Sequence, residues 1–319
     1  MGELAMAALG RTGVPVSNLG VGGYLGSLRD PEASDEQCIA AAIAAVRRAV
    51  DLGVRYFDTS PGYGEAERRL GHGLRALSPA QRDRLTVSTK VGTHPERRQE
   101  YGRDAVRWSF ERSGELLGRI DVVYVHDPTD DEHMDRILGG GGAFEALAEL
   151  RSQGVIRALG LGVRRHRFLR RAVDDGRCDA ILPSYDYHPL RTTAAPVLAH
   201  AAASRVGVAN ASPYNAGLLA GIDLDEAAAR RAPRDADLAR AQQLWTWCRE
   251  RDVDLGVLAV QHNLRCPDID TVLVGPRTVD EVEGCVRHAT TALPDGIWEE
   301  LGSFVGNLEP AAAPGGEAQ

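Results

Sequence analysis

The sequence predicts a (β/α)8 barrel, and three observations lead to that fold class. Short apolar runs alternate with longer amphipathic stretches along most of the 319 residues, which is the pattern of strand and helix units around a parallel sheet. The short apolar runs number eight, the strand count of a closed barrel. No G-x-G-x-x-G turn opens a helix after the first run, which disfavours the competing open, doubly wound sheet.

The predicted strands are rich in apolar and β-branched residues and most end at a glycine or a polar residue. They are Asn18–Gly23, Val54–Thr59, Leu85–Lys90, Ile120–His126, Ile156–Gly162, Cys178–Ser184, Val206–Ser212 and Thr271–Gly275. Between the first two, apolar residues recur at helical spacing from Ile39 to Val50 before Gly53 ends the run. We expect one barrel domain over residues 1–308. The glycine-rich segment Ile137–Phe144 is expected as a loop, and residues 309–319 as a flexible tail too poor in apolar groups to pack.

Composition narrows the function classes. The net charge is −8, and no run of Lys or Arg is longer than a pair, so a nucleic-acid partner is disfavoured. The apolar stretches fall short of the about 18 residues that a membrane span needs, and the first residues lack a basic start followed by an apolar core. We therefore expect a cytoplasmic protein without a membrane partner. Five cysteines without a C-x-x-C pair indicate reduced thiols and no structural zinc.

Four polar residues stand where a barrel forms its active site, at or after the ends of consecutive strands. Asp58 ends the second predicted strand, Tyr63 follows in its loop, Lys90 ends the third and His126 ends the fourth. Neighbouring strands lie about 5 Å apart, so these groups can converge on one cavity. Each alone has a simpler interpretation: a turn cap for Asp58, a solvated strand end for Lys90, a core histidine for His126. Their occurrence together favours a site.

The chemistry of such a set follows from its pKa values. A free tyrosine has a pKa of about 10, and an adjacent ammonium is expected to lower it by about a unit or more. Lys90 would act on Tyr63 in this way, with Asp58 keeping Lys90 charged and His126 orienting a substrate oxygen. A tuned tyrosine suits proton transfer at a carbonyl or alcohol oxygen. The hydride would then come from a nicotinamide cofactor.

The chain also resembles a known family, the aldo-keto reductases, over nearly its full length. The resemblance rests on "GRTGVPVSNLGVGGY", "FDTSPGYGEAERRLG", "VSTKVG", "YVHDP", "ASPYNAGLLAG" and "VLVGPRTVDEVEGCV", in this order. It implies that Asp58, Tyr63, Lys90 and His126 form the tetrad that interconverts carbonyls and alcohols with NAD(P)(H). It also implies an N-terminal β-hairpin within Met6–Gly20. Within the family, the stretches "RIDVVYVHDP", "SYDYHPL" and "ASPYNAGLLAG" are most similar to the branch of sugar dehydrogenases that oxidise L-galactose, L-fucose or related aldoses at C1.

The resemblance further implies a set of binding residues. Tyr24, with Tyr63 and His126, would line the substrate pocket. The implied cofactor contacts, besides Asp58, are Gly22, Gly23, Arg164, Ser184, Ser212, Pro213, Tyr214, Gly217, Gly275, Pro276, Arg277, Thr278, Glu281 and Cys285. Four positions depart from the family pattern around nicotinamide: Arg164-Arg165 replaces Ser-Asn, Ser184 replaces a glutamine and Ala211 replaces a stacking tyrosine. The basic run from Arg164 to Arg171 is equally consistent with the solvated start of a helix.

The choice between NADP and NAD depends on two residues near the C-terminal end. Arg277 could clamp a 2′-phosphate, whereas a carboxylate at Glu281 would repel it and accept a ribose hydroxyl. The expectation leans to NADP. Alternatively, Arg277 and Glu281 form a surface ion pair across one helical turn.

Two other functions remain open from the sequence. The fold also serves as a cofactor-holding regulatory subunit of channels, and the altered nicotinamide positions are compatible with a barrel reused for non-redox chemistry. The identity of the small-molecule carbonyl or alcohol substrate and the oligomeric state are left open.

Overall fold

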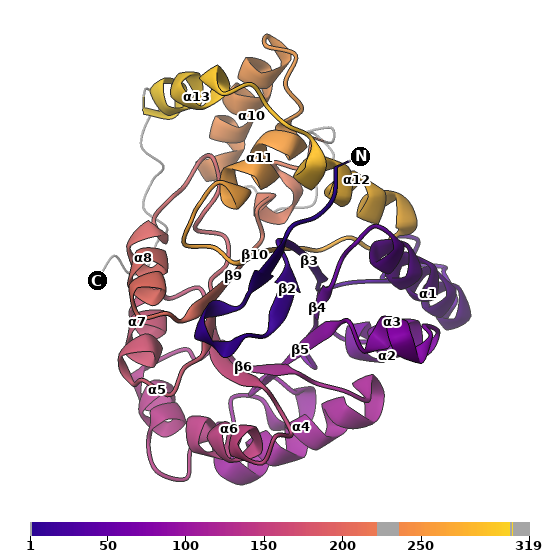
Figure 1. Cartoon of the computed structure of the whole chain (residues 1–319), viewed down its shortest axis with the longest axis vertical. Coiled ribbons are helices and arrows are strands. Elements are labelled where there is room, and N and C mark those ends of the chain that lie inside the picture. The colour runs from indigo at the N-terminus through magenta and orange to yellow at the C-terminus, as the bar shows by residue number, and fades with distance from the viewer. Residues whose placement is uncertain (1, 222–235, 307, 309–319) are drawn as a thin grey trace.

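The computed structural model describes residues 2–221, 236–306 and 308, so the predicted tail, residues 309–319, lies outside the described residues. At its centre, eight parallel strands close into a barrel in the order β10-β3-β4-β5-β6-β7-β8-β9 (Figure 1). The predicted fold class is confirmed, and each predicted run matches one strand, with β5 extending one residue beyond its run. The strands are β3 (Leu19–Gly22), β4 (Tyr56–Asp58), β5 (Thr86–Val91), β6 (Val122–His126), β7 (Ala158–Gly162), β8 (Ala180–Leu182), β9 (Gly207–Ala211) and β10 (Thr271–Val274).

Helices surround the barrel in a ring (Figure 1). They are α1 (Asp35–Asp51), α2 (Ala66–Arg75), α3 (Pro79–Arg82), α4 (Arg103–Leu117), α5 (Asp131–Leu138), α6 (Ala143–Ser152), α7 (His166–Asp174), α8 (Ala195–Ala203), α10 (Ala236–Arg249), α11 (Leu255–Leu264), α12 (Val279–Thr290) and α13 (Gly296–Gly306). Three 3-10 turns, η1 (Gly10–Thr12), η2 (Pro95–Arg97) and η3 (Asn215–Gly217), complete the list. No helix among the described residues combines the length and the apolar composition that a membrane crossing requires.

The sequence explains where these helices begin and end. The α1 helix starts at a capping box in which Ser34 and Gln37 satisfy each other's backbone amides. The expected loop Ile137–Phe144 is shorter than predicted, because Ile137 and Phe144 lie in α5 and α6 with both side chains fully buried. The apolar ends of this stretch are helical, and only the glycines between them form the turn.

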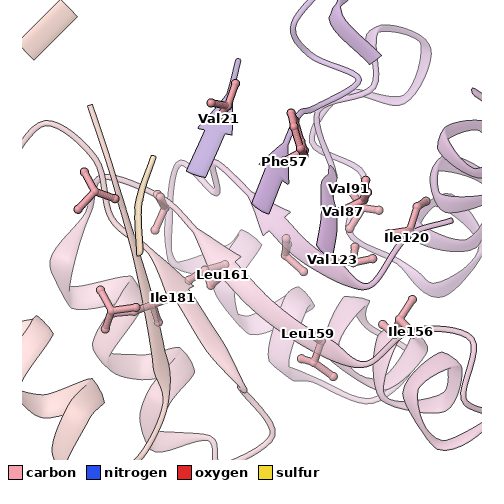
Figure 2. Close-up of a cluster of buried hydrophobic side chains, with 14 of the residues drawn as sticks. Val21, Phe57, Val87, Val91, Ile120, Val123, Ile156, Leu159, Leu161 and Ile181 are labelled. Carbon is pink, nitrogen blue, oxygen red and sulfur yellow. The ribbon is translucent and has the colours of Figure 1, made fainter. Parts of the chain in front are cut away.

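Alternation along the strands sorts side chains into two layers. Phe57, Val87 and Val123 point outward and pack with residues of the surrounding helices, as Figure 2 shows for this cluster. Their neighbours Tyr56 and Tyr124 point into the barrel, where their hydroxyls lie 3.1 Å apart. Because side chains alternate with a period of two, the residues two positions further along β4 and β6, Asp58 and His126, also face the interior.

A β-hairpin closes the end of the barrel at which the strands begin, as the family resemblance implied. It consists of β1 (Met6–Ala8) paired antiparallel with β2 (Pro15–Ser17). Leu9, Val14 and Val16 of this segment are fully buried and cluster with the inward-facing side chains of the strands. Burial of these apolar groups excludes water from the lower barrel.

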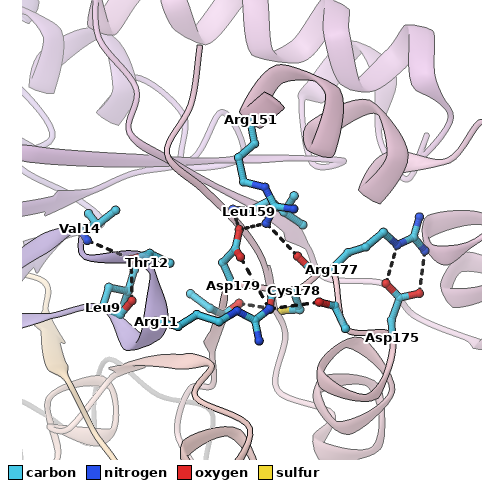
Figure 3. A network of polar contacts seen from close by, with 12 residues as sticks. Leu9, Arg11, Thr12, Val14, Arg151, Leu159, Asp175, Arg177, Cys178 and Asp179 are labelled. Carbon is cyan, nitrogen blue, oxygen red and sulfur yellow. Dashed lines mark hydrogen bonds and ion pairs between the residues drawn. The ribbon is translucent and has the colours of Figure 1, made fainter. Parts of the chain in front are cut away.

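Three aspartates at this closed end stand directly before β6, β8 and β10, and each accepts a hydrogen bond from the preceding strand. Asp121 binds the amide of Val87, Asp179 that of Leu159, and Asp270 that of Val208. Figure 3 shows how Asp179 also pairs with Arg151 and with Arg11, which in turn donates to backbone oxygens. These carboxylates satisfy amides that the ladder between strands leaves free.

We expect Asp179→Ala to lower the free energy of unfolding by about 2–3 kcal/mol, since it leaves the buried Leu159 amide without an acceptor and removes the carboxylate that pairs with Arg11 and Arg151. Urea unfolding followed by circular dichroism measures the change. The matched control is Glu115→Ala, which removes an exposed carboxylate from an i,i+3 pair with Arg112 and should cost less than about 0.5 kcal/mol. Equal midpoints for the two variants would contradict this assignment.

Candidate active site

A buried ion pair lies at the open end of the barrel. The Nζ of Lys90 on β5 is 2.5 Å from Oδ2 of Asp58 on β4, with side chains 1% and 6% exposed. The ammonium also donates to the carbonyl of Thr59 at 2.8 Å, and the hydroxyl of Ser88 donates to the other Asp58 oxygen at 2.6 Å. The pair is therefore satisfied on both sides, as burial of two charges requires. Lys90 is also the only lysine in the chain.

Tyr63 approaches this pair from the loop after β4. Lys90 Nζ is 4.9 Å from the centre of the Tyr63 ring, and the ring stands edge-on to His126 with centroids 5.8 Å apart. On its other side lies Tyr24, at 5.4 Å between centroids. The structure thus brings together all four residues predicted for proton transfer, and places the half-exposed Tyr24 beside them.

The pKa of Tyr63 corrects one prediction. Burial raises this pKa above its ordinary value, and the lowering effect of the Lys90 charge does not outweigh it. Burial lowers the pKa of Lys90, but the negative charge of Asp58 and the hydrogen bond to its carboxylate outweigh burial, so this pKa is raised as well. The lysine does act on the phenol in the predicted direction, but the sequence does not reveal how deeply the ring is buried.

His126 is held as a neutral imidazole. Burial and the nearby Lys90 charge keep its pKa well below the ordinary value. Its Nδ1 lies 2.9 Å from the hydroxyl of Thr93, and its Nε2 lies 3.4 Å from a carboxylate oxygen of Asp127. A carboxylate accepts hydrogen bonds and a threonine hydroxyl can donate one, so we assign the proton of the ring to Nε2. This nitrogen is then a donor for a ligand oxygen.

Sequence reasoning missed several supports of this site. Thr93 fixes the His126 ring, and the buried hydroxyl of Tyr101 donates to the His126 carbonyl at 2.9 Å. Glu67 on α2 is buried and accepts a hydrogen bond from Thr89, and burial raises its pKa. Only Glu67 could have been noticed in the sequence, because it is a charged residue between Ala66 and Leu70 on the apolar face of α2. The sequence places Tyr101 in a segment that could edge the pocket, but the contacts of Thr93 and Tyr101 with His126 are made across loops and do not follow from it.

A second polar network crosses the ends of β7 and β8. Arg164 binds both carboxylate oxygens of Asp186, at 2.9 and 3.1 Å, so it is not simply a solvated helix start. Arg191 joins Asp186 to Asp237 on α10. Although burial alone would raise it, the His166 ring at 3.3 Å and the hydrogen bonds from Arg164 hold the pKa of Asp186 well below its usual range. Ser184 and Ala211 bridge to each other nearby.

The start of α12 holds the other predicted cofactor residues. Thr278 caps the helix by accepting from the amide of Glu281 at 3.3 Å. The Glu281 carboxylate accepts from the backbone amide of Arg277 at 2.7 Å and pairs with Arg29 at 3.0 Å. Among the described residues, the alternative side-chain ion pair between Arg277 and Glu281 is not formed. The Arg277 guanidinium donates to the carbonyl of Ser27 at 3.3 Å.

The remaining predicted contacts lie at the end of β3, in the loops after β3, β9 and β10, and within α12. Gly23 has φ +84°, and no atom lies within 4 Å of the position that a Cβ would take there. The hydroxyl of Tyr214 is 2.8 Å from Nδ1 of His288, and burial raises the pKa of Cys285 to about 12. The others are Gly22, Ser212, Pro213, Gly217, Gly275 and Pro276.

Comparison with known proteins gives a consistent result. The profile of the aldo/keto reductase family matches residues 18–305. The chain is 32% identical to D-threo-aldose 1-dehydrogenase of a Pseudomonas species, over 93% of this chain and 94% of that protein. It is also 32% identical to L-galactose dehydrogenase of Arabidopsis thaliana, over 97% and 96% of the two chains. The crystal structure of PA4992 from Pseudomonas aeruginosa superimposes with a TM-score of 0.63 at 26% identity, covering 91% and 97%.

The raised pKa of Tyr63 predicts that its phenol keeps its proton throughout the neutral range in the protein without cofactor. An acid loses its proton only as the pH rises through its pKa, so tyrosinate from this residue should form only above about pH 10. Titration of the absorbance at the tyrosinate band, for the wild type and for Tyr63→Phe, measures this. The two curves should coincide up to pH 10. An extra tyrosinate in the wild type below pH 9 would refute the prediction.

Proposed function

The chain belongs to the aldo/keto reductase family, and on that premise we propose that Tyr63 carries the proton as this oxidoreductase interconverts a carbonyl and its alcohol. The observation that carries the proposal is the buried pair of Lys90 and Asp58 beside the Tyr63 ring. A buried ammonium close to a phenol stabilises the phenolate relative to the phenol. The phenolate is the form that Tyr63 takes after it gives up its proton and before it accepts one.

In reduction, the phenol of Tyr63 gives its proton to the carbonyl oxygen while the carbonyl carbon gains a hydride, and the product is the alcohol. In oxidation, the phenolate takes the proton of the alcohol as the carbon loses a hydride. Lys90 stabilises the phenolate in both directions, and Asp58 keeps Lys90 charged and in place. His126 donates from Nε2 to the substrate oxygen and orients it. The nicotinamide of NAD(P)(H), when bound, supplies or accepts the hydride.

Two features of the open end support a dinucleotide cofactor. The open backbone at Gly23, joined to Asp58 by a 3.2 Å hydrogen bond, lets a flat ring approach the main chain beside the ion pair. The first amides of a helix point away from it and bind phosphate well, and α12 begins next to Arg277. In place of the expected serine and asparagine, Arg164 keeps one guanidinium nitrogen, Nη1, outside its pair with Asp186. We assign the nicotinamide carboxamide to that nitrogen.

For the substrate, we propose an aldose or a related hydroxylated aldehyde. The support comes from the names of two relatives that match almost end to end, D-threo-aldose 1-dehydrogenase and L-galactose dehydrogenase. A cofactor titration with NADPH and NADH, followed by an absorbance screen at the nicotinamide band against sugars, aldehydes and ketones, tests the whole proposal. Binding of neither dinucleotide would overturn it.

Replacement of Tyr63 by Phe should lower turnover by about 10²–10⁴-fold, because the ring remains while the acid–base group is lost. Cofactor affinity, measured by fluorescence titration, should stay within about threefold. Tyr187→Phe is the matched control, since it removes a hydroxyl beside Cys266 and away from the tetrad. Turnover undiminished in Tyr63→Phe would remove Tyr63 from the mechanism.

Arg277→Ala should weaken the binding of NADPH about tenfold and that of NADH less than threefold, if this guanidinium receives the 2′-phosphate. Fluorescence titration gives both dissociation constants. Arg287→Ala makes the same charge change at the far, exposed end of α12 and serves as control. Equal losses for the two dinucleotides in Arg277→Ala would instead indicate NAD-type recognition, in which Glu281 accepts a ribose hydroxyl.

A further inference from the structure

Asp127 occupies a distinctive place at the open end of the barrel, directly after His126. Its backbone lies in the left-handed region at φ +48°, a conformation that Asp tolerates better than most residues. Its amide donates to the carbonyl of Gly162 at 3.0 Å, which continues the pairing of β6 with β7 by one residue. The main chain is therefore fixed, and it holds the start of the side chain at the site.

The Asp127 carboxylate lies next to the position expected for the substrate oxygen. One of its oxygens lies 3.4 Å from Nε2 of His126, the nitrogen that we assign as donor to the substrate. The side chain is 60% exposed, so it faces the opening rather than the core. The negative charge of Asp127 also acts on Tyr63 and helps to raise the pKa of that phenol. Any ligand oxygen bound to Nε2 thus lies beside a carboxylate.

Holding the His126 ring does not account for this residue. Thr93 already fixes Nδ1 at 2.9 Å, and Tyr101 fixes the backbone carbonyl. Within the part of the chain that the structure describes, no backbone amide or hydroxyl donates to the Asp127 carboxylate. Both oxygens therefore retain lone pairs for an incoming donor.

We propose that Asp127 is a specificity-determining residue, which accepts a hydrogen bond from a hydroxyl on the carbon next to the reacting carbonyl carbon. The proposal rests on the proposed function and names the feature of the substrate that this chain selects. A 2-hydroxy aldehyde can accept a hydrogen bond from Nε2 of His126 with its carbonyl oxygen and donate one to the Asp127 carboxylate with its hydroxyl. A plain aldehyde offers the carboxylate no donor and leaves it to water, so it lacks the hydrogen bond that distinguishes the two substrates.

The test compares two substrates that differ by one hydroxyl, 2-hydroxypropanal and propanal, in NADPH-dependent reduction by the full chain. Wild type should have a kcat/KM at least about 30-fold higher for 2-hydroxypropanal. Asp127→Ala should lower kcat/KM for 2-hydroxypropanal about 10–100-fold and for propanal less than threefold. Asp127→Asn, which keeps the backbone preference and one acceptor, should fall between these values.

Three controls separate this inference from a structural effect and from the proposed function. Glu132→Ala removes an exposed carboxylate from the neighbouring α5 and should leave both substrates unchanged. NADPH affinity and melting temperature should be nearly the same in Asp127→Asn as in wild type. Equal losses on both aldehydes, or no preference in wild type, would overturn the role of Asp127 while leaving the enzyme an aldehyde reductase. Turnover of neither aldehyde together with no dinucleotide binding would instead overturn the proposed function.

Discussion

The ion pair between Lys90 and Asp58 is the constraint on which the site depends. Two charges with almost no solvent contact are tolerated only when further hydrogen bonds compensate them. Ser88 donates to Asp58 and the Thr59 carbonyl accepts from Lys90, and both residues lie on or next to β4 and β5. The pair therefore requires these two strands to be adjacent, parallel and in this register. A one-residue shift would turn Lys90 outward into the helix layer.

The closed end of the barrel protects this pair from below. The hairpin segment and the paired hydroxyls of Tyr56 and Tyr124 fill the interior beneath Asp58. With water excluded on that side, electrostatic effects among the groups above are larger than they would be in solution. The same exclusion explains why burial outweighs Lys90 at Tyr63 and why His126 stays neutral. Packing at one end thus sets the protonation states at the other.

The sequence predicted the parts of the molecule that follow from local pattern. All eight strands were predicted, because an apolar run and the residue that ends it are close together in the sequence. The four polar residues were predicted because they lie at or just after those strand ends. The network of Arg164, Asp186, Arg191 and Asp237 was missed, since its members come from separate loops and from α10. The direction of the Tyr63 pKa was wrong for a related reason: burial depends on how loops fold over the barrel, which no single stretch encodes.

The single lysine described above has a consequence for how the molecule can be probed. Of the 37 Lys and Arg side chains, the other 36 are guanidinium groups, which do not react with acylating or aldehyde reagents as amines do. The one ε-amine in the chain is enclosed at the centre of the site. Amine-directed labelling of this protein therefore has only the chain's α-amino group and Lys90 as targets, and labelling of Lys90 requires both entry of the reagent at the open end and loss of the proton that Asp58 holds on the amine.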